Sequence, residues 1–167
     1  MPEPRRATTA GNARCRPRGP AAPWVHGVAL GAILAAVASV FGQVGGFGFL
    51  NLDDDGYVTE NAAVRAGLTE ASVRWAFTHF EEGHYHPVTW LSHMLDVTLF
   101  GVAPGAHHLV NAALHAAGAS LLYLVLVAGA GRPWLALVVA LLYAVHPLRA
   151  ESVAWVSERK DVLGALF

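Results

Sequence analysis

The sequence of 167 residues predicts an all-α, polytopic helical membrane protein. Apolar segments at about 24–44 and 109–127 approach the roughly 20 residues that an α-helix needs to cross a bilayer. A third segment, 133–146, has an apolar stretch of about a dozen residues, which covers only about 20 Å. A fourth apolar run starts at Val162 and reaches Phe167 without a stop signal. We therefore expect about three spans and the front piece of a longer protein.

Charge is distributed unevenly along the chain, although the net charge is only −1. Residues 1–23 contain a single acid and five arginines: Arg5, Arg6, Arg14, Arg16 and Arg18. This segment is also rich in Pro, Gly and Ala, which favours a disordered basic tail. The segment 45–106 reverses the balance, with eight acids against two arginines. The positive-inside rule then predicts a multi-pass inner-membrane protein with a cytoplasmic N-terminus and an exported loop at 45–106.

Two features of the N-terminal region limit the alternatives. A cleaved signal peptide is the competing interpretation of residues 1–44, but its apolar core would span only about 7–15 residues, so we favour a retained anchor. Cys15 is the sole cysteine of the chain. Neither a disulfide framework nor a cysteine metal site is therefore expected.

Polar residues within the apolar segments point to a bundle interior. Asn111 and His115 are four residues apart and share one helical face, so we expect them to face a bundle or cavity instead of lipid. The short third segment would place His146 and Arg149 below the nominal membrane surface, toward a buried site.

The exported loop contains two stretches with helical periodicity. Thr69 is a suitable N-cap for a helix with an apolar stripe formed by Val73, Ala76, Phe77 and Phe80. Pro87 suits the first turn of a second helix, whose apolar face comprises Val88, Leu91, Leu95 and Thr98, with Met94 and Leu99 beside it. Both are expected to be amphipathic helices on the membrane surface. Two packed helices of a small soluble subdomain remain an alternative.

The acidic run Asp53–Asp55 partly imitates an EF-hand calcium loop, with Gly56 near the expected turn. The position that should hold a bidentate Glu is Ala62, so we do not predict calcium binding of that type. A solvated acidic turn is the alternative to a functional site.

Histidines cluster in and beside the same loop. His84 and His86 could bind a transition metal in an extended chain, but no third ligand completes a recognised signature. Ligand positioning or ordinary interfacial histidines are the favoured interpretation, and no metal site is predicted.

A second charged block covers residues 146–161. Glu151 and Glu158 are seven residues apart, which predicts one helical face, while Arg149 and Lys160 follow another. One face could pair with a cation or hydroxyl and the other with a phosphate. A structural ion-pair network would give the same pattern, and spacing does not separate the two. By counting spans, this block and Asp53–Asp55 lie on one side of the membrane.

Four ordered motifs carry a resemblance to a known family: LDDDGYVTEN (52–61), HPVTWLSH (86–93), GAHHLVNAALH (105–115) and HPLRAESVAWVSERKDVL (146–163). Together they resemble the N-terminal part of the bacterial relatives of the transmembrane and tetratricopeptide-repeat O-mannosyltransferases. The resemblance covers about residues 24–167. It implies the GT-C glycosyltransferase architecture, in which a polytopic helical domain has its active site on the exported side and is followed by helical repeats.

The resemblance also implies a chemistry: transfer of a sugar, mannose, from a polyprenyl-phosphate donor to a protein hydroxyl. The family's paired acids fall on Asp53 and Asp54, one of which would deprotonate the acceptor, and Asp55 leaves open which carboxylate is the base. Asn61 matches a downstream family Asn. The other predicted substrate-binding residues are His86, His146, Arg149, Glu151, Arg159 and Lys160, with His146, Arg149 and Lys160 on the phosphate side.

The expected partners are thus the donor lipid, a protein acceptor and membrane lipid, with no nucleic acid. No cofactor is predicted, and a divalent metal is left open. Two rival functions remain: a non-catalytic membrane scaffold that binds proteins through helical repeats, and a transporter or flippase for the same lipid.

Overall fold

The computed structural model describes residues 22–80 and 83–167, so the predicted tail lies almost entirely outside the described residues. Helices account for most of this part of the chain, and it contains no β-strand, which confirms the all-α class. The helices are α1 (Pro23–Phe41), α2 (Ala62–Arg65), α3 (Glu70–Thr78), α4 (Pro87–Phe100), α5 (Pro104–Ala130), α6 (Pro133–Ala144), α7 (Arg149–Ala154) and α8 (Arg159–Gly164). A 3₁₀ turn, Gly42–Gly46, extends α1, and a π-helical turn covers Asp55–Thr59.

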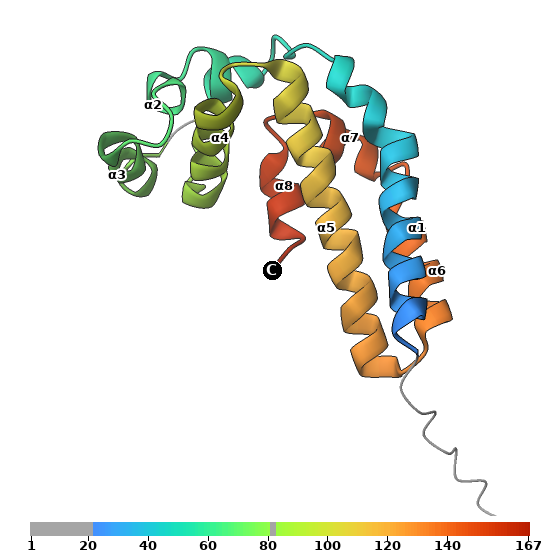
Figure 1. Cartoon of the computed structure of the whole chain (residues 1–167). Helices are drawn as coiled ribbons and strands as arrows, with labels where there is room; N and C mark the ends of the chain where they lie inside the picture. The colour runs from blue at the N-terminus through green and yellow to red at the C-terminus, as the bar shows by residue number, and fades with distance from the viewer. Residues whose placement is uncertain (1–21, 81–82) are drawn as a thin grey trace, which may run out of the picture.

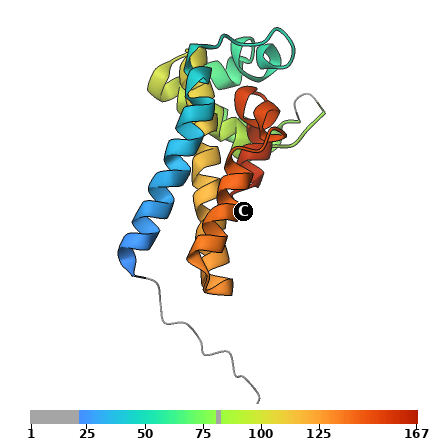
Figure 2. The same ribbon diagram turned by 90° about the vertical axis from the view of Figure 1, so that its right-hand side faces the viewer.

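Helices α1, α5 and α6 form an elongated bundle (Figures 1 and 2). Their shared core is rich in alanine, and small side chains let the helices approach closely. Tyr123 of α5 lies in this core, and its hydroxyl is 2.9 Å from Nδ1 of His26 on α1. The loop after α1 and helices α7 and α8 gather at the same end of the bundle (Figure 1). The two charged blocks thus lie at one end of the bundle, and their location on one side of a membrane stays a prediction.

Two helical segments are long and apolar enough to cross a membrane, Pro23–Gly46 and Pro104–Ala130. The second extends beyond the predicted 109–127 at both ends. Helix α6 has only 12 residues, in line with the short third segment expected from the sequence. A polytopic arrangement with three spans stays a prediction.

Helices α3 and α4 of the loop begin where the sequence predicted, whereas α2 was not predicted. Thr69 caps α3 in a capping box with Ser72, and Pro87 is the first residue of α4. Helix α4 buries Thr89, Trp90, His93, Met94 and Asp96. Of its predicted apolar residues, it exposes Val88, Leu95 and Leu99 and buries Met94. The buried face is therefore mixed, with three polar side chains directed into the protein. An outward apolar face is the arrangement expected of a helix against lipid.

The loop also has a core of its own, formed by Tyr57, Val58, Val64, Ala76, Trp90, Met94 and Val156. The ring of Trp90 lies between those of Tyr57 and Trp75, at centroid distances of 4.7 and 5.5 Å. Because Val156 comes from the second charged block, this core joins the block to the loop.

The prediction of one helical face through Glu151 and Glu158 is wrong. The block forms two short helices, and Trp155 between them is extended, with φ −104° and ψ 124°. The physical reason lies in tertiary hydrogen bonds on both sides of the break. Asn111 Nδ2 donates to the carbonyl of Trp155 (2.9 Å), and the amide of Ser157 donates to Asp54 (3.0 Å).

Candidate functional site

Asp54 links the two charged blocks. Its side chain is fully buried, with Oδ1 accepting from the amide of Ser157 and Oδ2 accepting from the amide of Leu50 (2.9 Å). Each carboxylate oxygen thus accepts one backbone N–H, which fixes the side chain between the two segments. The expected proximity of the acidic run to the block at 146–161 is confirmed by this contact across 103 positions of sequence.

The three acids of the run have different environments. Asp53 is exposed to solvent. Asp55 is partly buried and accepts a hydrogen bond from the hydroxyl of Thr59 (2.7 Å). Only Asp54 is engaged by the second block, so the sequence-adjacent carboxylates are not chemically equivalent.

A cavity of about 620 Å³ lies beside the Asp54 link. One wall is the turn after α1, residues 46–50, and the others are His108 of α5 and residues of α7 with Trp155. Asp54 accepts hydrogen bonds from the backbone amides of Leu50 and Ser157. Leu50 lines the cavity, and Ser157 is two residues beyond Trp155, which also lines it. Glu151 is the carboxylate that lines the cavity. The volume is in the range of small-molecule sites.

A second hollow, of about 230 Å³, contains two predicted substrate-binding residues, His86 and Lys160. Apolar side chains including Val88 and Leu163 complete it. Nζ of Lys160 donates to Oε1 of Glu158 at 2.9 Å and lies 5.7 Å from the centre of the Tyr57 ring.

These neighbours perturb both groups. Partial burial, followed by the charges of His84 and Lys160, lowers the pKa of His86. Burial alone would lower the pKa of Lys160, but its hydrogen bond to Glu158 and the nearby acidic groups outweigh burial and raise it. Lys160 therefore stays positively charged, and it shares a hollow with His86, whose imidazole is harder to protonate than usual.

His146 and Arg149 lie elsewhere. His146 is exposed, and its Nδ1 accepts from the amide of Leu148 (3.2 Å). The guanidinium of Arg149 lies 4.7 Å from the centre of the Tyr143 ring and lines a different hollow, of about 350 Å³, against α5. The structure thus brings His86 together with Lys160, while Arg149 lines a separate hollow.

Arg159 has no exposed surface. It donates to Asn111 Oδ1 (2.7 Å), Ser92 Oγ (3.2 Å) and the carbonyl of His107 (2.8 Å), and forms an ion pair with Asp96. Burial lowers the pKa of Arg159 and raises that of Asp96, and in each case the partner charge opposes the effect. We therefore assign Arg159 a structural role, the alternative that spacing left open, in place of the predicted contact with substrate.

Asn61 is likewise occupied within the fold. Its Oδ1 accepts from the amides of Ala63 and Val64, which caps α2, and its Nδ2 donates to the carbonyl of Gly56 (3.3 Å). In this geometry the side chain fixes the turn that follows the acidic run.

The buried polar cluster of His93, Asp96 and His107 was not predicted from the sequence. All three side chains are buried, at the contact between α4 and the start of α5. A signal was present: His93 and Asp96 are one turn apart on a largely apolar helix. Their partner His107 comes from another helix, which spacing along the chain does not reveal.

Comparison with known proteins gives partial similarity to one group. The chain is 35% identical over 130 residues to the human protein named Protein O-mannosyl-transferase TMTC1, covering 68% of this chain and 14% of that protein. It is 36% identical over 83 residues to mouse Protein O-mannosyl-transferase TMTC2, covering 50% of this chain and 10% of that protein. Mouse TMTC1 is 34% identical over 130 residues, covering 68% of this chain and 13% of its own length.

This weak, partial homology supports a relation to these proteins. The chain spans about a seventh or less of the length of the curated relatives it matches. No family model matches the chain, and no solved structure matches it.

Proposed function

We propose that this chain is part of a GT-C-type membrane glycosyltransferase that moves mannose from a polyprenyl-phosphate donor to a protein hydroxyl on the exported side of the membrane. The observation that carries the proposal is the Asp54 link, which joins the acidic run to the α7–α8 block beside a cavity of about 620 Å³. The similarity to proteins named O-mannosyl-transferases supports the same class.

In this reaction the acceptor oxygen bonds to C1 of the sugar while the bond from C1 to the phosphate oxygen breaks. A carboxylate must take the hydroxyl proton, and a positive group must stabilise the departing phosphate. Both oxygens of Asp54 already accept backbone N–H groups, so its proposed role is to hold the cavity walls in position. The open carboxylates, Asp53 beside it and Glu151 in the cavity, are the candidates for the base.

For the donor phosphate, the hollow with Lys160 and His86 offers a positive charge and a neutral donor. The exposed apolar residues of α4, which begin with Val88 at this hollow, would accompany the prenyl chain. Arg149 and His146 remain proposed contacts of the donor, but neither lines the hollow that holds Lys160 and His86.

The experiment separates binding from transfer. Four variants are compared: Asp53→Asn, Asp54→Asn, Glu151→Gln and Lys160→Gln. Donor-lipid binding is measured on this chain in proteoliposomes, and transfer is measured on the natural protein that contains it. Loss of the base should spare donor binding and lower transfer by about 10²- to 10⁴-fold, whereas Lys160→Gln should weaken donor binding. Unchanged transfer in all three carboxylate variants would refute the proposal.

Orientation needs its own test. In a Cys15→Ser background, a cysteine at Ala66, an exposed position of the loop, should react with an impermeant thiol reagent from outside, whereas one at Gly11 in the tail should not. Labelling of Gly11→Cys alone would reverse the proposed topology. The scaffold alternative gains no support from the named relatives.

A further inference from the structure

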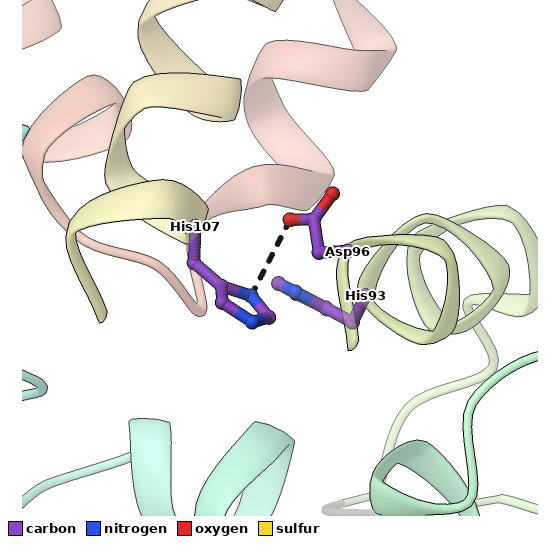
Figure 3. Close-up of side chains that lie close together, drawn as sticks. All are labelled: His93, Asp96 and His107. Carbon is purple, nitrogen blue, oxygen red and sulfur yellow. Dashed lines mark ion pairs between the residues drawn. The ribbon is translucent and has the colours of Figure 1, made fainter. Parts of the chain in front are cut away.

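The cluster of His93, Asp96 and His107 lies outside the proposed active site, and its side chains converge from two helices (Figure 3). One ligand-type atom from each residue lies within 4.8 Å of the others. Nδ1 of His107 is 3.3 Å from Oδ2 of Asp96, and the rings of His93 and His107 stack with centroids 6.0 Å apart. The side chains of His93 and His107 have no exposed surface.

The hydrogen bonds of His107 determine its tautomer. Nε2 lies 3.3 Å from the carbonyl oxygen of Gly101, and since a carbonyl can only accept, Nε2 must carry the proton. In the neutral imidazole, Nδ1 then carries a lone pair, and its nearest carboxylate oxygen is Oδ2 of Asp96, 3.3 Å away. Two electron-rich atoms 3.3 Å apart repel each other unless a cation lies between them.

No hydrogen bond joins these two atoms. Nδ1 of His107 has no hydrogen-bond partner among the described residues, although Oδ2 of Asp96 lies 3.3 Å away. With the proton on Nε2, both atoms are acceptors, so neither can donate to the other.

His93 gives independent support. Both of its ring nitrogens are buried without a hydrogen-bond partner in the described part of the chain. An unpaired buried polar atom destabilises the fold, so two on one ring call for a ligand.

We propose that His93, Asp96 and His107 form a binding site for a divalent transition metal of the class of Zn²⁺, which joins α4 to the start of α5. In a tetrahedral site with metal–ligand bonds of about 2.0–2.1 Å, neighbouring ligand atoms lie roughly 3.3 Å apart, which is the separation of His107 Nδ1 and Asp96 Oδ2. Two imidazoles and one carboxylate favour Zn²⁺ and similar ions over Mg²⁺ or Ca²⁺, which prefer oxygen.

The surroundings match those of a ligand set. The second nitrogen of His107 donates to a backbone carbonyl, as an outer partner of a metal ligand commonly does, and Oδ2 of Asp96, the oxygen nearest His107, also accepts from Arg159. Arg159 also holds α8 through Asp96, so the ion would fix the helix pair on which the second charged block rests. Its role would be structural, because the cluster lines none of the hollows described above.

The test uses the whole chain, purified in detergent in a Cys15→Ser background and stripped with a chelator. Zn²⁺ alone is titrated by calorimetry into this protein, into His93→Gln, and into a His84→Gln/His86→Gln control. The control removes the stacked histidine pair of the loop, whose centroids are 5.1 Å apart and which could bind metal independently. His93 forms no hydrogen bond within the described residues, so replacing it removes a ligand and no other polar contact.

The proposal expects about one Zn²⁺ per chain, retained in the control and weakened about tenfold or more in His93→Gln. Absence of saturable binding, equal binding in His93→Gln, or loss of binding in the control would each overturn it. If His93→Gln does not fold, zinc X-ray absorption on the control variant decides. Two imidazoles and one carboxylate oxygen around the ion support the site, and any other nitrogen count refutes it.

Discussion

The ion pair of Arg159 and Asp96 should be the most sensitive point of the fold. Replacing Asp96 by Leu leaves a fully buried guanidinium with only neutral partners: Asn111 Oδ1 at 2.7 Å, Ser92 Oγ at 3.2 Å and the carbonyl of His107 at 2.8 Å. Breaking one side of a buried pair costs about 3–5 kcal/mol. At about 1.36 kcal/mol per factor of ten, the folding equilibrium should fall by roughly two to four powers of ten.

The assay is equilibrium unfolding in mixed micelles, followed by the fluorescence of Trp90, which is buried on the same helix as Asp96, and of Trp155, which is four residues before Arg159. The double variant Asp96→Leu/Arg159→Met should recover most of the loss, because it removes the buried charge together with its partner. Glu70→Gln is a matched control: it breaks an exposed ion pair with Arg74 and should change stability little.

Two results would refute the reasoning. A loss below about 1 kcal/mol in the single variant would mean that water or another anion reaches Arg159. Failure of the double variant to recover stability in protein stripped of metal would mean that packing of the Asp96 side chain, and not charge, is what the site requires.

Three further predictions concern other contacts. Gly105→Ala should destabilise the protein, because the added Cβ would collide with the backbone carbonyl of Gly45 in the turn after α1. Gly118→Ala should be neutral or stabilising in the same unfolding assay, because the atom nearest to its added Cβ is 3.7 Å away. Asn61→Ala should cost about 0.5–2 kcal/mol through the lost cap of α2 while Asn61→Asp keeps most of it, and equal losses would contradict the capping role. The positive charge of Lys160 helps to lower the pKa of His86, so Lys160→Met should raise that pKa toward its usual value in an NMR titration. An imidazole with a lowered pKa stabilises the fold above its unfolded pKa of about 6.5, and this stability is lost as the pH falls. The variant should therefore lose less stability than the parent protein below about pH 6.5.

Local signals were sufficient for the start of the two longer loop helices. Thr69 and Pro87 begin α3 and α4 as predicted, because capping and proline geometry depend on a few neighbouring residues. Periodicity was less informative about which face of a helix is buried in the protein. Helix α4 exposes Val88 and Leu95 and buries Asp96, because the burial of a face depends on what packs against it.

The candidate site was predictable only in outline. Sequence reasoning placed the acidic run and the block at 146–161 on one side of the membrane, which stays a prediction, and the structure shows the two in contact at one end of the bundle (Figure 1). It did not distinguish Asp54, buried between two backbone amides, from Asp53, which is exposed. It also treated residues 146–161 as one helix, because the hydrogen bond from Asn111 that ends α7 comes from a distant segment.

The sequence by itself determined the helical class, the apolar segments long enough to span a bilayer and the positions of the charged motifs, because these depend on composition and short-range periodicity. The tertiary structure alone decided the function of individual polar residues. Arg159 became a buried structural charge, Asp54 a link between two segments, and His107 a partner of α4. The physical reason is that a polar side chain takes its role from the groups that surround it once water is removed, and packing, not spacing, selects those groups.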